Sequence, residues 1–261
     1  MIRKLAEPDR NIVIQFLATT EFNAFCVGNI CNYGFASATV DSWGDFSQSG
    51  QLLAVLQRYE KFFVISAAAD YDSRKILTIL QQHRDYESVS GREEFMQQLA
   101  VSLGSELQVK RYMQLSSEQH SVQQTAIAVE AATLEDSTLI DDLLVSVEFG
   151  FCPGEIVERY QRTLAKGEAR YFIVKQDGKI VACAATAAEC AQSAVIVSVC
   201  CRAEYRRQGL AEACMRELCR TLTGEGKQLY LFYENPLAGK LYEKLGFVTI
   251  GEWAMIETEA L

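Results

Sequence analysis

The sequence predicts a mixed α/β protein with two domains. Three observations support this: the length, the alternation of strand-type and helix-type segments, and one polar segment between two apolar halves. A chain of 261 residues is long for one ordinary domain and sufficient for two. The most polar stretch, SSEQHSVQQT, covers residues 116–125, so we expect an N-terminal domain over 1–118 and a C-terminal domain over 125–261.

The composition indicates a globular chain. Apolar residues make up 49% and charged residues 23%, so burial can outweigh the chain entropy lost on folding along the whole length. No apolar run is long enough to span a bilayer, and the first residues do not form a secretory signal. We therefore expect a cytoplasmic protein with no membrane partner.

Charge and cysteine spacing argue against two classes of function. The net charge of −9 disfavours nucleic-acid binding and is compatible with attraction of cationic amines. The nine cysteines contain no C-x-x-C pair, and His83 and His120 do not complete the spacing of a zinc site, so we expect no metal. The cysteines are interpreted as reduced, mostly buried small apolar residues.

The C-terminal half begins with a strand and two helices. Residues 125–132 predict a strand. Thr133, followed three residues later by Asp136, is a capping box that opens a helix over 134–147. A second helix is predicted over 155–165, where apolar residues recur at helical spacing before a Lys-Gly stop.

Strands then dominate the pattern. Residues 170–189 contain two β-rich runs around Asp177-Gly178, a dipeptide favoured in tight hairpin turns. The apolar run 193–201 (SAVIVSVCC) predicts a central strand buried on both faces. The remaining predicted elements are a helix from Gly209, a strand over 227–233, a helix from Pro236 and strand material over 247–257.

The N-terminal half follows the same plan in weaker form. It contains a helix after Asp9, a hairpin over 51–69, a helix over 72–82 and a later helix within 90–103. The similarity rests on element order, so a duplicated domain is a hypothesis that an all-helical N-terminal half would contradict. Because this half lacks a G-x-A turn, we expect no cofactor there.

The segment YRRQGLAEACMRELC, residues 205–219, places two arginines and a glycine before an amphipathic helix. The N–H groups of a first helical turn lack intrahelical partners and attract anions, and glycine lets a ligand approach the backbone. Neither a Walker loop nor a G-x-G-x-x-G turn is present. The junction therefore predicts a diphosphate site; the alternative is an ordinary helix start with two solvated arginines.

Here the sequence resembles the GNAT superfamily of N-acetyltransferases over roughly residues 125–258. The family turn, [RQ]-x-x-G-x-[GA] after a central strand, is matched by RRQGLA after VSVCC. A second signature, an Asn before a helix ending in Y-x-x-x-G-F, is matched by Asn235 and residues 242–247. The resemblance implies a GNAT-like fold in the C-terminal half and a degenerate GNAT-like or accessory α/β domain in the N-terminal half.

The resemblance also implies the cofactor and its contacts. In the family, the backbone of this turn binds the pyrophosphate of acetyl-coenzyme A, a role that falls here to Arg206, Arg207, Gln208, Gly209, Leu210 and Ala211. The backbones of Val199 and Cys201 would bond the pantetheine arm as an added strand. Asn235 completes the cofactor-binding set. Ala203 and Ala211 depart from the commonest family residues without removing a donor.

The chemistry needs an acid and a base. Tyr242 is implied as the acid that protonates the departing thiolate, and the structural alternative is a core aromatic residue. The central strand lacks the acid that many relatives carry, which leaves Glu148, Glu189 and Glu234, each interpreted as a solvated surface carboxylate. A covalent mechanism through Cys200 or Cys201 lacks a basic partner, so direct transfer is preferred.

The expected function is therefore acetyl-CoA-dependent transfer to a primary amine of a small molecule or peptide in a ternary complex. We expect a monomer or homodimer. The alternative is an acyl-CoA-binding sensor or assembly module without efficient catalysis. The acceptor and the length of the acyl chain stay open at this point.

Overall fold

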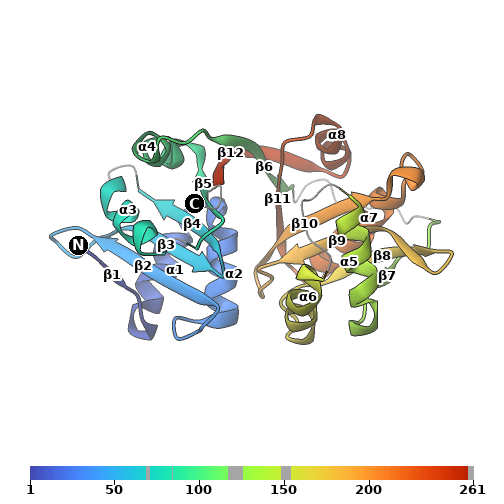
Figure 1. Cartoon of the computed structure of the whole chain (residues 1–261), viewed down its shortest axis with the longest axis horizontal. Helices are drawn as coiled ribbons and strands as arrows, with labels where there is room; N and C mark the ends of the chain where they lie inside the picture. The colour runs from blue at the N-terminus through green and yellow to red at the C-terminus, as the bar shows by residue number, and fades with distance from the viewer. Residues whose placement is uncertain (69–70, 84, 117–125, 148–153, 258–261) are drawn as a thin grey trace. The chain divides into compact units, whose positions relative to one another are not determined.

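The computed structural model describes residues 1–68, 71–83, 85–116, 126–147 and 154–257 (Figure 1). Contacts divide the chain into two compact units. Unit 1 comprises Met1–Tyr112, Phe232–Glu234 and Thr249–Leu261, and unit 2 comprises Met113–Leu231 and Asn235–Val248. Among the helices of the described ranges, none combines the length and apolar character needed to cross a membrane.

The first half of the chain is mixed α/β. It is therefore not all-helical, which would have contradicted the hypothesis of a duplicated domain. Its strands are β1 (Ile2–Lys4), β2 (Val40–Phe46), β3 (Leu52–Tyr59), β4 (Phe62–Ala67), β5 (Ser88–Arg92) and β6 (Gln108–Leu115). Its helices are α1 (Arg10–Leu17), α2 (Ala24–Tyr33), α3 (Ser73–Gln82) and α4 (Glu93–Leu103). The predicted hairpin and the helices at α1, α3 and α4 are present.

Unit 1 is built on a sheet of order β1-β2-β3-β4-β5-β12. Its pairs are antiparallel except β4 with β5, which is parallel. Strand β12 (Phe247–Glu257) comes from the end of the chain and sets Trp253 opposite Arg92. Phe63, Met96 and Leu99 are fully buried in the core of this unit.

The second half forms the predicted elements in the predicted order. Its strands are β7 (Glu130–Ala131), β8 (Tyr171–Gln176), β9 (Lys179–Ala187), β10 (Ser193–Cys201), β11 (Gln228–Tyr233) and β12. Its helices are α5 (Ser137–Ser146), α6 (Glu155–Ala165), α7 (Leu210–Gly224) and α8 (Pro236–Lys244). In unit 2 the sheet order is β7-β8-β9-β10-β11, with β6 beside β11.

Local chemistry explains several of these boundaries. The Asp136 carboxylate accepts hydrogen bonds from the backbone N–H of Thr133 at 2.9 Å and from its hydroxyl at 3.2 Å, which confirms the capping box. Asp177 and Gly178 both have positive φ, 49° and 73°, as a tight hairpin turn between β8 and β9 requires.

The strand predicted over 125–132 is too long, because only Glu130 and Ala131 form one. This edge strand pairs with Ile173 and Phe172 alone. Residue 125 lies outside the described residues.

The two halves share one element order: strand, two helices, three strands, helix, strand, helix, strand. The units also exchange strand segments. Most of β12, from Thr249 on, belongs to unit 1 and pairs with β5, and the last residues of β6, Met113–Leu115, belong to unit 2. A plan repeated in all ten elements supports the duplication hypothesis more strongly than the sequence pattern did.

Candidate active site

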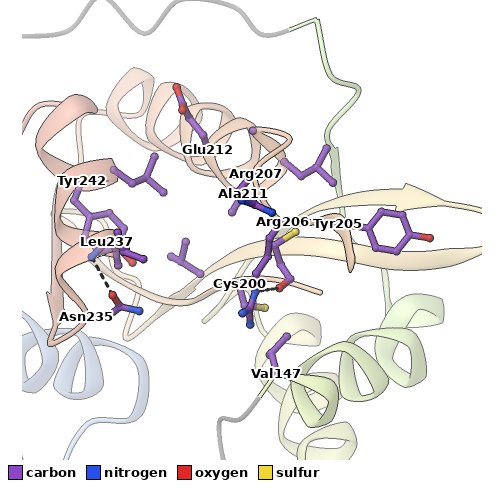
Figure 2. A pocket seen from close by; sticks show the side chains of 16 residues that line it. Val147, Cys200, Tyr205, Arg206, Arg207, Ala211, Glu212, Asn235, Leu237 and Tyr242 are labelled. Carbon is purple, nitrogen blue, oxygen red and sulfur yellow. Dashed lines mark hydrogen bonds between the residues drawn. The ribbon is translucent and has the colours of Figure 1, made fainter. Parts of the chain in front are cut away.

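The site is a cavity of about 650 Å³ in unit 2, where the end of β10, the start of α7 and one face of α8 meet (Figure 2). The strand contributes Val199, Cys200 and Cys201. The residues on α7 and its preceding turn include Arg206, Arg207, Gly209, Leu210, Ala211 and Glu212, and those at α8 include Asn235, Leu237, Leu241 and Tyr242. A volume of this size is typical of a small-molecule or cofactor pocket.

The strand wall exists because two parallel strands separate. β10 pairs with β11 only from Ser193 opposite Gln228 to Ile196 opposite Leu231, so the second half of β10 leaves that partner. On its other side, the register with β9 shifts between Val197 and Cys200. Ser198, at this bulge, has φ of 52°, a conformation uncommon for a residue with a side chain. The separated strand end borders the cavity.

The turn before α7 forms a second wall. Arg207 and Gly209 have φ of 63° and 78°, and no side chain caps the helix at Gly209. A Cβ atom at Gly209 would meet nothing closer than the side chain of Ile127, at 3.8 Å. The Arg206 guanidinium donates to the carbonyl of Cys201 at 3.4 Å, which links the turn to the strand (Figure 2). Backbone donors and positive charge thus converge here.

Helix α8 supplies the third wall. The Asn235 side chain accepts a hydrogen bond from the backbone N–H of Leu237 at 2.9 Å and so caps the helix. Tyr242 is 6% exposed and packs edge to face with Phe247, at 6.1 Å between ring centroids. Tyr242 therefore combines the packing of a core aromatic residue with a place on the cavity.

The structure brings together nearly all residues that the sequence assigned to the site. Every predicted cofactor-binding residue lines the cavity except Gln208, which is exposed in the turn between Arg207 and Gly209. The helix α7 is amphipathic, as predicted, because Leu210, Cys214, Leu218 and Leu222 are all buried. Co-location places these residues where the predicted contacts could form; their roles stay predictions.

The two candidate bases that the structure describes, Glu189 and Glu234, do not line this cavity. Glu189 is 5% exposed and binds Arg170 and Lys227, so the interpretation as a solvated carboxylate is wrong for it. It follows β9, and the ion pairs with Arg170 and Lys227 compensate the charge of this buried carboxylate. Glu234 is exposed, and Glu148 lies outside the described residues.

A lining carboxylate that sequence analysis did not single out for the site is Glu212. It accepts hydrogen bonds from Arg216 at 2.7 Å and from Lys244 at 2.8 Å. Burial alone would raise the pKa of this carboxyl, but hydrogen bonds from Lys244 and Arg216 outweigh it and hold the pKa below its usual value. Its spacing with Arg216 is visible in the sequence, whereas the contact with Lys244 depends on the fold.

The Cys201 thiol is a poor nucleophile. Burial raises the pKa of the Cys201 thiol, and its neighbour Cys200 raises it further, against the opposing charge of Arg206. A thiol with a raised pKa carries little thiolate at neutral pH. This agrees with the preference for direct transfer. Within the described ranges, no group of His, Cys, Asp and Glu side chains is arranged to hold a metal ion.

Comparison with protein families identifies the class. Residues 138–247 match the model of the acetyltransferase (GNAT) family. Over these residues the chain matches an acyltransferase domain of the GNAT class. No curated protein matches the chain.

Solved structures extend the likeness to both halves. A GCN5-related N-acetyltransferase from Sphaerobacter thermophilus has 16% identity and a TM-score of 0.66, with 100% of this chain and 95% of that chain covered. A GCN5-related N-acetyltransferase-like protein from Streptococcus suis has 16% identity and a TM-score of 0.65, with 96% of this chain and 99% of that chain covered. A tandem GNAT protein from the clavulanic acid biosynthesis pathway has 15% identity and a TM-score of 0.61, with 100% of this chain and 98% of that chain covered. These identities establish the fold alone.

Proposed function

We propose that the protein transfers an acetyl group from acetyl-coenzyme A to a primary amine by direct attack in a ternary complex. One observation carries the proposal: the uncapped start of α7 and the separated end of β10 border the same cavity as Tyr242. The first two features suit a diphosphate and an extended amide-bearing arm. The third supplies a proton donor to the same space.

The residues fit the coenzyme. Helix α7 has 15 residues, and its first turn presents N–H groups without intrahelical acceptors. An anion at such an end gains about 0.3 to 1 kcal/mol from the helix dipole, so backbone hydrogen bonds and the arginines must add to it. The open space at Gly209 allows the close approach that a diphosphate needs. The strand end beyond Ile196 can extend its ladder to an amide-bearing ligand.

The chain's own groups then have two tasks. When bound, acetyl-coenzyme A would supply the acyl group as a thioester. An alkyl amine is neutral in roughly one molecule in two thousand at pH 7, so a base or solvent path must take its proton before attack. The Tyr242 hydroxyl would deliver a proton to the departing sulfur, which prevents the reverse attack. Its burial against Phe247 fixes the ring that carries this hydroxyl.

The test is acetylation of a pool of polyamines, amino acids, aminoglycosides and lysine peptides, followed by mass spectrometry of the products. We expect an acetylated amine whose formation requires both protein and acetyl-coenzyme A. Calorimetric titration with coenzyme A separates binding from turnover. Tight binding without any acetylated product would favour the sensor or assembly module, and no binding by folded protein would refute both.

The measured product must be the acetylated amine rather than free thiol. The chain itself contains nine cysteines, which would react with a thiol reagent and obscure coenzyme release. Propionyl- and succinyl-coenzyme A serve as matched donors, because they share the nucleotide and differ only in the acyl group. A higher rate with one of them would correct the donor but keep the reaction class.

A further inference from the structure

Two buried thiols lie against each other beneath the strand wall of the cavity. Cys183 on β9 is paired directly with Cys200 on β10, and their sulfur atoms are 3.5 Å apart. Opposed residues on antiparallel strands have Cα atoms about 4.5 to 5.5 Å apart, within the range of about 4.4 to 6.8 Å that a disulfide spans. The backbone is therefore already placed for a bond between them, and side-chain rotation can supply the rest.

The two thiols differ in access. Cys200 lines the cavity, whereas Cys183 is fully buried. The thiol of Cys183 donates to the carbonyl of Ser198 at 3.0 Å. Contact with Cys200 and burial both raise the pKa of the Cys183 thiol, so Cys183 is unsuited to react first. A reagent that enters the cavity meets Cys200 first.

This pair also supports the irregular part of β10. The register shift lies between Val197 and Cys200, and the carbonyl that Cys183 contacts belongs to Ser198, the residue with positive φ. A disulfide would consume the thiol hydrogen of Cys183 and so remove its hydrogen bond to the carbonyl of Ser198. Ser198 directly precedes Val199, which lines the cavity.

We propose that Cys183 and Cys200 are a redox-active pair that hydrogen peroxide converts to an intrachain disulfide through the cavity. The Cys200 sulfur attacks one peroxide oxygen, the O–O bond breaks, and a sulfenic acid and water result. The Cys183 sulfur then attacks that sulfur and releases a second water. Two thiols lose two electrons and two protons, and one peroxide becomes two waters.

Sequence provides a direct assay for the bond. Trypsin leaves Cys183, Cys190, Cys200 and Cys201 on one peptide, because no Lys or Arg lies between Lys179 and Arg202. Additional cleavage after Glu189 separates 180–189, with Cys183, from 190–202. We expect peroxide-treated full-length protein, blocked and digested without reductant, to yield these two peptides linked, and dithiothreitol to release them.

Single serine variants identify the partner. Cys200→Ser and Cys183→Ser should abolish the link, while Cys201→Ser and Cys190→Ser should retain it. The wild-type peptide map keeps the test valid if a variant fails to fold, because fragmentation of the linked peptides locates the bridged sulfur. A bridge through Cys190 or Cys201, or oxidation without any link, would overturn the proposal.

A ligand in the coenzyme site should slow the oxidation of Cys183 and Cys200. This part of the test rests on the proposed function. Desulfo-coenzyme A is the probe, because it lacks the thiol that would itself consume peroxide. We expect saturating desulfo-coenzyme A to slow the link several-fold. An unchanged rate, with binding verified by calorimetry, would show that the ligand does not cover Cys200 and would refute the shielding. No link in ligand-free protein would refute the redox pair while the coenzyme titration still stands.

Discussion

At the residue scale, Tyr242 is the group whose removal separates chemistry from binding. Tyr242→Phe keeps the ring that packs on Phe247 and removes only the hydroxyl. Because general acids contribute about 10²- to 10⁴-fold, we expect kcat to fall at least tenfold with little change in coenzyme affinity. Steady-state kinetics and calorimetry measure the two quantities.

The matched control for Tyr242 is Tyr205→Phe. Tyr205 lines the cavity from the turn before α7, and Figure 2 shows its ring directed away from the other labelled side chains. This variant should retain turnover. Unchanged kcat in Tyr242→Phe would remove the tyrosine from the mechanism.

Gly209 is the residue of the turn whose substitution should weaken coenzyme binding. Gly209→Asp places a carboxylate at the start of α7, where a diphosphate would lie, in a left-handed conformation that Asp tolerates. A like charge at a few ångströms costs on the order of 1 to 4 kcal/mol, so we expect coenzyme affinity to fall about tenfold or more. Titration calorimetry checks this.

Gly226→Asp is a close control for Gly209→Asp. Gly226 has φ of 80° and, like the open site at Gly209, has space for a side chain, but it lies outside the cavity. Equal losses of affinity in the two variants would mean that net charge, rather than the turn, governs binding.

The residue scale also shows what the sequence could establish. The residues of the turn and of the α8 signature are close in the chain, so their spacing predicted the cavity walls. Glu212 and Lys244 are 32 positions apart and meet only after α7 and α8 pack. Burial of Glu189 also depended on tertiary contacts with Arg170 and Lys227, which no local pattern encodes.

At the scale of elements, the Glu212 ion pair joins the first turn of α7 to the end of α8. Glu212 contributes negative charge to the wall of a cavity suited to an anion, and Lys244 and Arg216 offset it. We therefore expect Lys244→Met to weaken coenzyme binding a few-fold and Glu212→Gln to strengthen it. Stability should change by less than about 1 kcal/mol, because Lys244 is 61% exposed.

The two substitutions should change coenzyme affinity in opposite directions. The double variant should bind with an affinity between those of the single variants, and all the differences should shrink at high salt. Lys240→Met removes a positive charge from an exposed position on the same helix and serves as the control. A Lys240→Met effect as large as that of Lys244→Met would contradict a specific role for the pair.

The elements that could be predicted are those whose ends carry capping or turn residues. The capping box at Thr133, the Asp177-Gly178 turn and the Asn235-Pro236 helix start are local signals, and each marks a boundary of the structure. Strand β5 contains Ser88, Ser90 and Gly91, whose weak strand propensity hides it. Gly91 is required because a Cβ there would lie 2.7 Å from the carbonyl of Ile65 on β4.

At the scale of the whole molecule, the two halves share a plan but differ where a coenzyme would bind. Helix α7 starts at an uncapped glycine, whereas α3 starts at Asp72, whose carboxylate accepts a hydrogen bond from the backbone N–H of Arg74 at 3.1 Å. The Asp72 carboxylate therefore occupies the start of α3, where an anion would have to bind, although Arg74 compensates its charge. We expect one coenzyme A per chain by calorimetry with active-site-titrated protein; two equivalents would contradict this.

Stability should depend on pH through a network that holds together three parts of unit 2. Arg170 precedes β8, Glu189 follows β9, and Glu225 follows α7; Arg170 binds both carboxylates, and Lys227 binds both as well. The hydrogen bond from Arg170 lowers the pKa of Glu225 from 4.5 to about 2, even though burial opposes the change. The ionised form is thus favoured in the folded protein.

The sign of the effect follows from that shift. A carboxyl whose pKa is lower in the folded state stabilises the fold above its unfolded pKa, and this contribution is lost as pH falls through the folded value. The loss should lie between pH 4.5 and about 2 for Glu225. We expect Glu225→Gln to have a lower melting temperature than wild type at pH 6, with the difference shrinking below pH 4.5. Glu243→Gln, at an exposed position on α8, is the control. A difference that persists undiminished at pH 3 would show that shape or hydrogen bonding, rather than the charge of Glu225, stabilises this part of the fold.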